Sequence, residues 1–201
     1  MAERVKRAGN WWVFWSIVAI GILPLAVAWY LVDHPGVMGK PGNHGSLIDP
    51  PRRVGYDLFQ PVTELSSRPL KEIRGRWVII HFFSNPCAQA CWETFANTYK
   101  LHLLLNKDIP RVRRLAIWSD AAPPGSETLR LLDKDKSLYF AKVSPAFLEG
   151  LVPEIAKNPL PGVRVVLMDP LGNLMMWYDS NFDPYGLYHD LQRLLRASRI
   201  G

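Results

Sequence analysis

The sequence predicts an α/β sandwich preceded by a single membrane-spanning helix. Three observations support this prediction. A segment near the N-terminus carries no charge over a length that can cross a bilayer, apolar β-branched runs alternate with longer helical patterns in the rest of the chain, and the only two cysteines follow directly after one of those runs. The chain has 201 residues, and after subtraction of the membrane segment about 165 residues remain, enough for one domain with its own core.

Residues 11–32 form the predicted anchor and contain no charged side chain. Their length suffices to cross a hydrocarbon layer about 30 Å thick, and tryptophan and tyrosine lie at both ends, where interfacial aromatic residues are common. A cleaved signal peptide is the alternative interpretation. The apolar region is too long for that, and no clear small-x-small cleavage site follows Tyr30, so we expect an uncleaved anchor.

Basic residues ahead of the anchor predict its orientation. Arg4, Lys6 and Arg7 outnumber the single acidic residue Glu3 within residues 1–10, and the positive-inside rule therefore places this segment in the cytoplasm. The rest of the chain would lie on the other side of the membrane. In a bacterium this predicts a single-pass protein of the inner membrane whose C-terminal domain is periplasmic, where disulfide chemistry is permitted.

A segment rich in proline and glycine, residues 33–61, follows the anchor. Because it shows no hydrophobic periodicity, we expect an extended extracytoplasmic tether. The folded domain is then expected to cover residues 62–201.

The charge pattern argues against nucleic acid as a partner. The formal net charge is only +6, and we find no dense basic run with interleaved aromatic residues. Arg111, Arg113 and Arg114 form the tightest basic cluster. Their near-alternation on a predicted strand indicates a solvated face.

The central feature of the sequence is a strand that leads directly into the two cysteines. The apolar, β-branched run from Arg76 to Phe83 indicates a buried strand, and Asn85-Pro86 ends it. Cys87 and Cys91 follow at the start of a helical pattern that continues to Leu105.

The spacing of Cys87 and Cys91 has chemical consequences. If both lie in the first turn of the helix, they share one face, and their Cα atoms are about 6 Å apart, which a disulfide tolerates. Two thiolates on one face can also hold a soft metal ion, and a helix N-terminus favours the thiolate form. The pair can therefore be a redox dithiol, a metal clamp or both. A static disulfide or two buried free thiols are the structural alternatives.

The remaining elements follow from local patterns. Ser144-Pro145 is a good helix start, because serine caps the helix and proline suits its first position. The leucines at 187, 191, 194 and 195 give the last helix an apolar side. In chain order we predict a strand at 111–119, a short helix at 126–132, a possible short strand at 138–140, a helix from 144 to about 157, a turn at 159–162, a strand at 163–169, a hairpin turn at 170–173, a returning strand at 174–178 and a helix at 184–199.

This order, β–α–β–α–α–ββ–α, is typical of a thioredoxin-like α/β sandwich. In such a fold Cys87 and Cys91 lie at the C-terminal end of the central strand. A thioredoxin-fold oxidoreductase also places a cis-proline opposite the dithiol. The corresponding position here is Val163, with Pro161 two residues earlier, which argues against a general disulfide reductase.

Several motifs together resemble the Sco/SenC family. These are the single anchor, the lead-in Arg-Gly-Arg-Trp-Val-Ile-Ile at 74–80, the C-x-x-x-C pair, and the hairpin Val-Val-Leu-Met-Asp-Pro-Leu-Gly-Asn at 165–173. The resemblance covers roughly residues 57–195. It implies a membrane-anchored, thioredoxin-like protein that helps to assemble the copper centre of cytochrome c oxidase, with Cys87 and Cys91 as redox-active residues and as ligands of Cu(I).

The sequence departs from this family at three places. Ala88 and Trp92, rather than proline, follow the two cysteines. The family's third copper ligand is a histidine eight residues before the hairpin aspartate. Counting back from Asp169 leads to Pro161, so this ligand is absent. Since a third ligand completes a trigonal Cu(I) site, we expect weaker copper retention. Trp92 is interpreted equally well as a docking residue over the cysteines or as an ordinary core residue.

We considered other soft or nitrogen ligands as replacements. His81 is interpreted as a satisfied core histidine, because it lies six residues ahead of Cys87 on the strand. His44 on the tether could fold back towards the cysteines. No cysteine lies near His102 or His189 in the sequence. Methionines in a hairpin are usually core residues, and this applies to Met168, Met175 and Met176.

The leading functional hypothesis is a Sco-like assembly factor whose dithiol keeps a partner's copper-binding cysteines reduced or passes Cu(I) transiently. Cys87 would attack as the thiol nearer the helix start, and Cys91 would resolve the mixed disulfide. The expected partners are the inner membrane and a cytochrome c oxidase subunit or another assembly factor. The alternatives are a general periplasmic thiol–disulfide oxidoreductase, which would make the protein an enzyme, and a non-catalytic assembly scaffold.

Overall fold

The computed structural model describes residues 11–34, 42–62, 68–83, 87–118, 124–144, 164–179 and 181–200. The chain divides into two compact units, Met1–Gly42 and Asn43–Gly201. In the first unit the described structure is one helix, α1 (Trp11–Asp33), whose 23 residues have no buried side chain. By length and composition α1 is a candidate membrane span, in agreement with the segment predicted from the sequence.

The second unit is built around a seven-stranded mixed sheet in the order β1-β7-β6-β3-β4-β5-β2. The three strands β3, β4 and β5 run parallel, and the outer pairs are antiparallel. Every residue of β3 is buried because the strand lies in the middle of the sheet. The strands are β1 (Ser46–Arg53), β2 (Gln60–Pro61), β3 (Trp77–Phe83), β4 (Val112–Trp118), β5 (Leu138–Lys142), β6 (Arg164–Met168) and β7 (Asn173–Tyr178).

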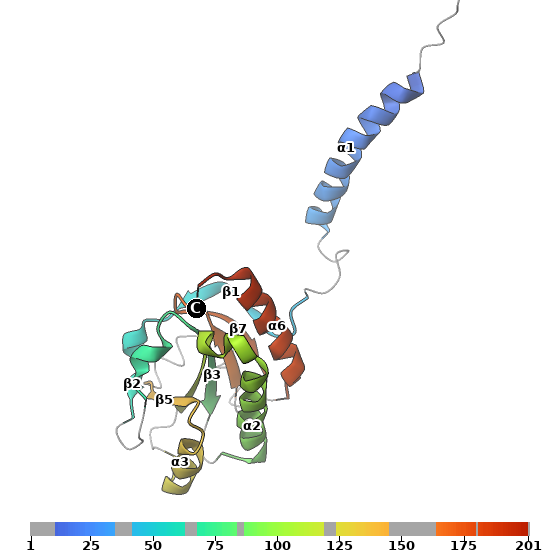
Figure 1. Cartoon of the computed structure of the whole chain (residues 1–201). Helices are drawn as coiled ribbons and strands as arrows, with labels where there is room; N and C mark the ends of the chain where they lie inside the picture. Colours follow the sequence, from blue (N-terminus) through green and yellow to red (C-terminus); the bar gives the residue numbers. More distant parts are fainter. Residues whose placement is uncertain are drawn as a thin grey trace, which may run out of the picture. The chain divides into compact units, whose positions relative to one another are not determined.

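Three helices pack on one face of this sheet: α2 (Gln89–Leu104), α3 (Ser126–Asp133) and α6 (Pro184–Ala197). Helices α2 and α6 lie side by side (Figure 1). Their apolar sides meet alternate residues of the central strands, such as Ile79 and Val165. The 3-10 turn η4 (Asn106–Arg111) connects α2 to β4.

The opposite face of the sheet carries a second apolar layer. It is formed by the other set of alternate strand residues, among them Val78, Ile80 and Leu115. Phe59 and Ile73 cover part of this layer, just after η2 (Tyr56–Leu58) and at the end of η3 (Leu70–Ile73). The alternation of the strands thus builds two cores from one sheet.

The structure confirms most of the predicted elements, including the short strand β5, the hairpin β6–β7 and the C-terminal helix. The sheet and helices together form the predicted thioredoxin-like α/β arrangement. The predicted helix at 144–157 and turn at 159–162 lie almost entirely outside the described residues, as do Asn85 and Pro86.

The structure differs from the sequence prediction at the predicted tether, residues 33–61. Ser46–Arg53 is strand β1, which pairs with β7 at the edge of the sheet, and Gln60–Pro61 is strand β2 at the other edge. Prolines 50 and 51 fit in β1 because its register shifts between Leu47 and Arg52, and edge strands tolerate proline at such irregularities. The second unit accordingly begins at Asn43 rather than near residue 62.

A buried carboxylate attaches the start of this unit to α6. Asp190 accepts hydrogen bonds from the backbone N–H groups of His44 (2.8 Å) and Gly45 (2.9 Å) and from the Tyr178 hydroxyl (2.8 Å). Burial acts to raise the pKa of Asp190, but these hydrogen bonds outweigh it and hold that pKa below its usual range. The ionised carboxylate is therefore the form that fastens residues 44 and 45.

We expect Asp190→Asn to loosen this attachment. Hydrogen bonds to a charged group contribute about 1.5–3 kcal/mol, so amide exchange at His44 and Gly45 should become about 10- to 100-fold faster. Hydrogen exchange followed by mass spectrometry measures this change, with Asp183→Asn, in the N-cap of α6, as the control. Unchanged exchange at both amides would show that Asp190 does not hold this segment.

Candidate redox site

The candidate site lies between the central strand β3 and helix α2 in the sequence. Helix α2 begins at Gln89 with Ala88 as its N-cap residue, and the first turn contains no acidic side chain. Cys91 is the third residue of the helix, and its backbone N–H donates to the Ala88 carbonyl at 2.9 Å. Cys87 lies ahead of the helix rather than within its first turn, which corrects the sequence prediction.

Cys87 and Cys91 form a disulfide bond, and their Cα atoms are 5.4 Å apart. The predicted proximity is confirmed although only Cys91 is helical, and Ala88 between the two has an extended backbone. The two residues differ in access to solvent. Cys91 is 2% exposed, whereas Cys87 is half-buried. An attacking sulfur can therefore reach Cys87 more easily than Cys91.

Apolar side chains surround the buried half of the disulfide. Cys91 belongs to a cluster with Phe83, Phe95 and Leu132, against which Cys87 and Trp92 pack from outside. The Trp92 ring lies 6.5 Å from the Phe95 ring, and its side chain is half-buried. Trp92 thus packs against the core, as one interpretation predicts, and is partly exposed; its role as a docking residue stays a prediction.

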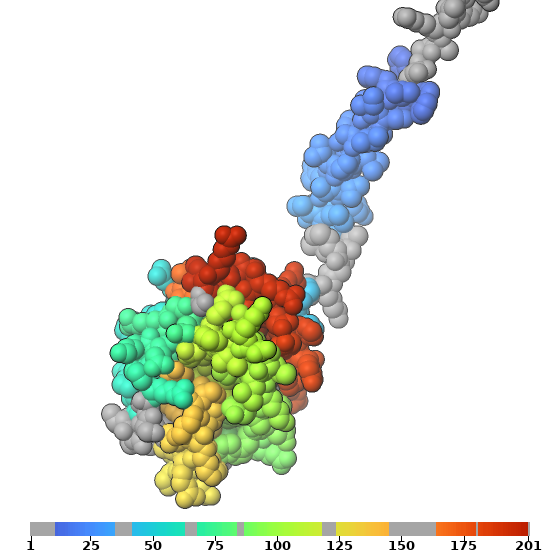
Figure 2. All heavy atoms as spheres, in the orientation of Figure 1, coloured from blue at the N-terminus to red at the C-terminus, as the bar shows by residue number. Residues whose placement is uncertain are grey.

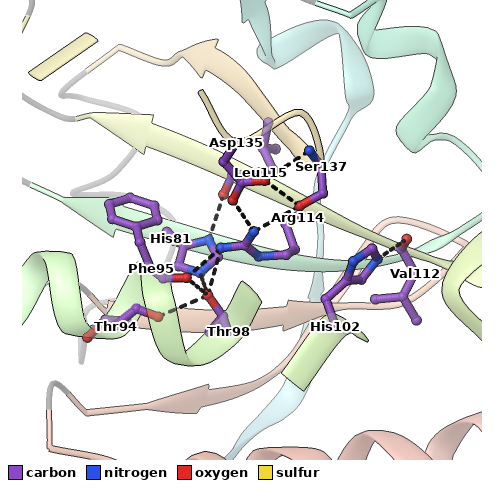
Figure 3. Close-up of polar contacts among 10 residues, drawn as sticks. All are labelled: His81, Thr94, Phe95, Thr98, His102, Val112, Arg114, Leu115, Asp135 and Ser137. Atoms are coloured by element: carbon purple, nitrogen blue, oxygen red, sulfur yellow. Dashed lines mark hydrogen bonds and ion pairs between the residues drawn. The ribbon is translucent and has the colours of Figure 1, made fainter. Parts of the chain in front are cut away.

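A buried polar layer lies under α2, between the two apolar clusters of this face (Figure 3). Its centre is Arg114 on β4, which is fully buried. One guanidinium nitrogen donates to the Phe95 carbonyl (2.8 Å) and to the Thr98 hydroxyl (3.0 Å). The other pairs with Asp135 and donates to Ser137. The layer therefore holds α2, which carries Cys91, against β4 and the start of β5.

Arg114 corrects the prediction of a solvated basic face. Arg111 and Arg113 are half-buried rather than solvated, and Arg111 donates to carbonyls near the C-terminus. A local signal for Arg114 existed in the sequence. Val112 and Ala116, two residues to either side on the same strand, are apolar and share its face.

His81 takes part in the same layer. Its Nδ1 lies 3.2 Å from the Leu115 carbonyl and its Nε2 lies 2.8 Å from the Thr98 hydroxyl. Since a carbonyl only accepts, Nδ1 carries the proton and Nε2 accepts from Thr98. Burial, reinforced by the positive charge of Arg114, lowers the pKa of His81 to about 3. This confirms the interpretation of His81 as a satisfied core histidine.

The other ligand candidates are distributed over the domain. The His102 ring bonds to the Val112 carbonyl, and burial lowers the pKa of this histidine. His44 and His189 lie beside each other, with ring centroids 6.2 Å apart. Met168 and Met176 are buried in the core, as expected.

Copper binding requires ligands that the described part of the chain does not assemble. Both sulfurs of the cysteine pair are joined in the disulfide, and the described residues contain no group of three His, Cys, Asp or Glu side chains that could hold a metal ion. Pro161 and Val163, the positions of the missing histidine and of the cis-proline, lie outside the described residues.

The chain is similar to a known protein family and to several solved structures. Residues 77–198 match the model of a family described as transmembrane-like, thioredoxin-like, C-terminal domain. No curated protein sequence matches the chain. Among solved structures, apo Sco1 from Thermus thermophilus is similar at 17% identity, covering 76% of this chain and 96% of that chain, with a TM-score of 0.52.

Two structures with copper bound are similar to the chain at comparable identity and TM-score. Yeast Sco1 with copper bound has 17% identity and a TM-score of 0.52, covering 80% of this chain and 96% of that chain. Copper-bound ScoI from Arabidopsis thaliana has 16% identity and a TM-score of 0.50, covering 64% and 89%. At this level of identity the similarity shows a shared Sco-type thioredoxin-like fold.

Proposed function

The chain belongs to the family described as transmembrane-like, thioredoxin-like, C-terminal domain, and from this premise we propose that it is a membrane-anchored thiol–disulfide exchange protein. The observation that carries the proposal is the Cys87–Cys91 disulfide between the central strand and the N-terminus of α2, with one sulfur reachable and the other buried. The Sco-type fold supports a more specific role, in which the exchange assists assembly of the copper centre of cytochrome c oxidase.

The proposed reaction uses the two cysteines in sequence. In the reduced chain, the Cys87 thiolate attacks one sulfur of a partner's disulfide, and the partner's other sulfur leaves as a thiolate. Cys91 then attacks Cys87, which forms the Cys87–Cys91 disulfide and releases the second partner thiolate. Two electrons pass to the partner, whose cysteines become free to bind copper, and a reduced dithiol protein restores the chain. The N–H groups at the start of α2 stabilise the thiolates that form.

Copper enters this proposal as a cargo rather than as a resident cofactor. Yeast Sco1 and Arabidopsis ScoI have structures with copper bound. Two thiolates from Cys87 and Cys91 would bind Cu(I) only transiently, because the described residues supply no third ligand. A Cu(I) titration of the full chain against a competing chelator tests this part, with the double Cys→Ser chain as control.

Helix α1 supports a proposal for the location of the chain. We propose that residues 11–32 anchor the chain in a bacterial inner membrane, with residues 1–10 in the cytoplasm and the folded unit in the periplasm. Candidate helix α1 and the family description support anchoring. The proposed partner is a cytochrome c oxidase subunit or another assembly factor, which would meet the folded unit beside the membrane.

Replacing Cys91 by serine is expected to trap the partner. Without Cys91 the mixed disulfide on Cys87 loses its intramolecular attacker, so its release should slow by at least about 100-fold. Non-reducing gels followed by mass spectrometry of the trapped species measure this in cells, with Cys87→Ser as the matched control that should trap nothing. Both variants should lower the copper content and activity of the oxidase.

The trapped species separate the alternative functions. One oxidase subunit or assembly factor supports the assembly role, whereas many unrelated partners support a general thiol–disulfide oxidoreductase. If neither variant traps a protein and the oxidase keeps its copper in both, the exchange proposal is wrong. A scaffold that retained the fold without the chemistry would then be the better description.

A further inference from the structure

An open groove lies on the face covered by α2 and α3, and Trp92, the residue after Cys91, is part of its lining. Its volume is about 940 Å³, and it lies between α2 and the segment from Leu131 to Tyr139, with Arg68 and Glu72 at one side. In Figure 2 the green atoms of α2, the gold atoms around β5 and the teal atoms near η3 meet on this face. Trp92, Phe95 and Leu132 line the groove and also belong to the apolar cluster around Cys91.

The floor of this groove is an apolar stripe along α2. Trp92, Ala96, Tyr99 and Leu103 line it at intervals of three and four residues, which places them on one side of the helix. Tyr99 is 42% exposed and Leu103 is 53% exposed. The stripe begins next to Cys91 and runs for about 16 Å at 1.5 Å per residue. A continuous exposed apolar stripe of this kind is typical of a surface that binds a partner.

The edges of the groove are basic. Its lining includes Arg68, Arg113, Lys134 and Lys136. Of its two acidic residues, Asp135 pairs with the buried Arg114, whereas Glu72 accepts from the Tyr139 hydroxyl and keeps its negative charge, because this bond lowers its pKa. Lys136 also lies 3.6 Å from Asp133. Positive charges still outnumber negative ones in the lining. The groove therefore presents an apolar floor between positive charges, and its complement is an apolar surface bordered by carboxylates.

We propose that this groove binds an amphipathic, acidic segment of the protein whose cysteines exchange with Cys87. The inference rests on the proposed function and names the chemistry of its partner. An amphipathic helix would lay its apolar side on the Trp92–Leu103 stripe and its Asp or Glu residues against the basic edges. Docking there brings the end of the segment beside the half-buried Cys87, which raises the effective concentration of the reacting sulfur.

A designed peptide tests the binding without any redox step. The probe is a fluorescent amphipathic helix of leucine and glutamate, about 18 residues long. Its binding to the full-length chain in detergent is measured by fluorescence anisotropy, beside a version with lysine for glutamate and a scrambled version. Only the acidic amphipathic peptide should bind, and its affinity should fall as salt is raised from about 0.05 to about 0.5 M.

Adjacent leucines provide a matched pair of variants. Leu103 and Leu104 are both 53% exposed on α2, but only Leu103 lines the groove. Leu103→Glu should weaken peptide binding at least about tenfold, whereas Leu104→Glu should change it less than about twofold. Lys136→Glu should also weaken binding. Its control is Lys100→Glu, which changes a lysine of α2 that does not line the groove. Equal losses of peptide affinity in the two variants of either pair would overturn the proposal. So would binding of the scrambled peptide as tight as that of the acidic amphipathic peptide.

Two further measurements complete the test. Binding of phosphatidylglycerol vesicles through the same residues, without peptide binding, would assign the groove to a lipid surface and also overturn the proposal. The double Cys87→Ser, Cys91→Ser chain should bind the peptide unchanged. Peptide binding therefore tests the groove proposal independently of the exchange reaction. The trapping experiment tests the exchange reaction.

Discussion

The Arg114→Leu chain is expected to lose about 3–5 kcal/mol of unfolding free energy, because it leaves a partly buried carboxylate without its partner. Asp135 is held by Arg114 and Ser137, and the Phe95 carbonyl and Thr98 hydroxyl each lose a donor. Without the hydrogen bonds from Arg114, the part of α2 that follows Cys91 should also become more mobile. Pulse proteolysis of the full chain in urea and detergent measures the change in unfolding free energy.

Two control chains define the origin of this effect. Arg113→Leu changes the neighbouring residue, which is half-buried and donates only to nearby carbonyls in the described contacts, and it should cost far less. Adding Asp135→Asn to Arg114→Leu should recover part of the stability, since the uncompensated charge is then removed. Equal losses for Arg113→Leu and Arg114→Leu would contradict the central role of Arg114.

The second large effect is acid destabilisation through His81. Burial and the charge of Arg114 lower the pKa of His81 to about 3 in the folded chain, while an unfolded histidine has a pKa of about 6.5. Between these values only the unfolded chain binds the proton. Stability should therefore be complete above about pH 6.5 and fall as the pH drops towards 3, by up to about 4–5 kcal/mol in total.

Measuring unfolding free energy across this pH range tests the prediction. His81→Leu should flatten the dependence between pH 3 and 6.5, although it lowers stability at neutral pH by removing bonds to Thr98 and Leu115. His189→Leu, a change at an exposed histidine, should leave the slope unchanged. Arg114→Leu should raise the pKa of His81 and therefore narrow the pH range below 6.5 over which this histidine destabilises the folded chain. An unchanged slope in His81→Leu would assign the acid loss to other groups.

Local patterns were sufficient for the elements that carry the candidate site. The β-branched run before Cys87 predicts a buried strand because burial on both faces requires an apolar residue at every position. The Pro-Leu-Gly-Asn turn and the leucine spacing of α6 are equally local signals. The C-x-x-x-C spacing predicted the cysteine contact, although in the structure Cys87 lies ahead of the helix and only Cys91 is helical.

Edge strand β1 and the buried polar layer were not predictable in the same way. The strand β1 contains two prolines and lacks clear alternation, and it exists because β7 offers an open edge more than a hundred residues later. The apolar neighbours of Arg114 indicate its buried face, but not its partners. It is tolerated inside because Asp135, Ser137 and Thr98, from other elements, bind its two terminal nitrogens.

For this protein, the sequence alone therefore determines the candidate membrane-spanning helix, the order of the main elements and the proximity of Cys87 to Cys91, because each depends on residues within a few positions of one another. Tertiary structure decides which cysteine is reachable, where the domain begins, why Arg114 is buried and how the α2 stripe becomes a groove beside the disulfide. These features depend on pairing and burial between distant segments, and no local pattern in the sequence predicts which segments will pair.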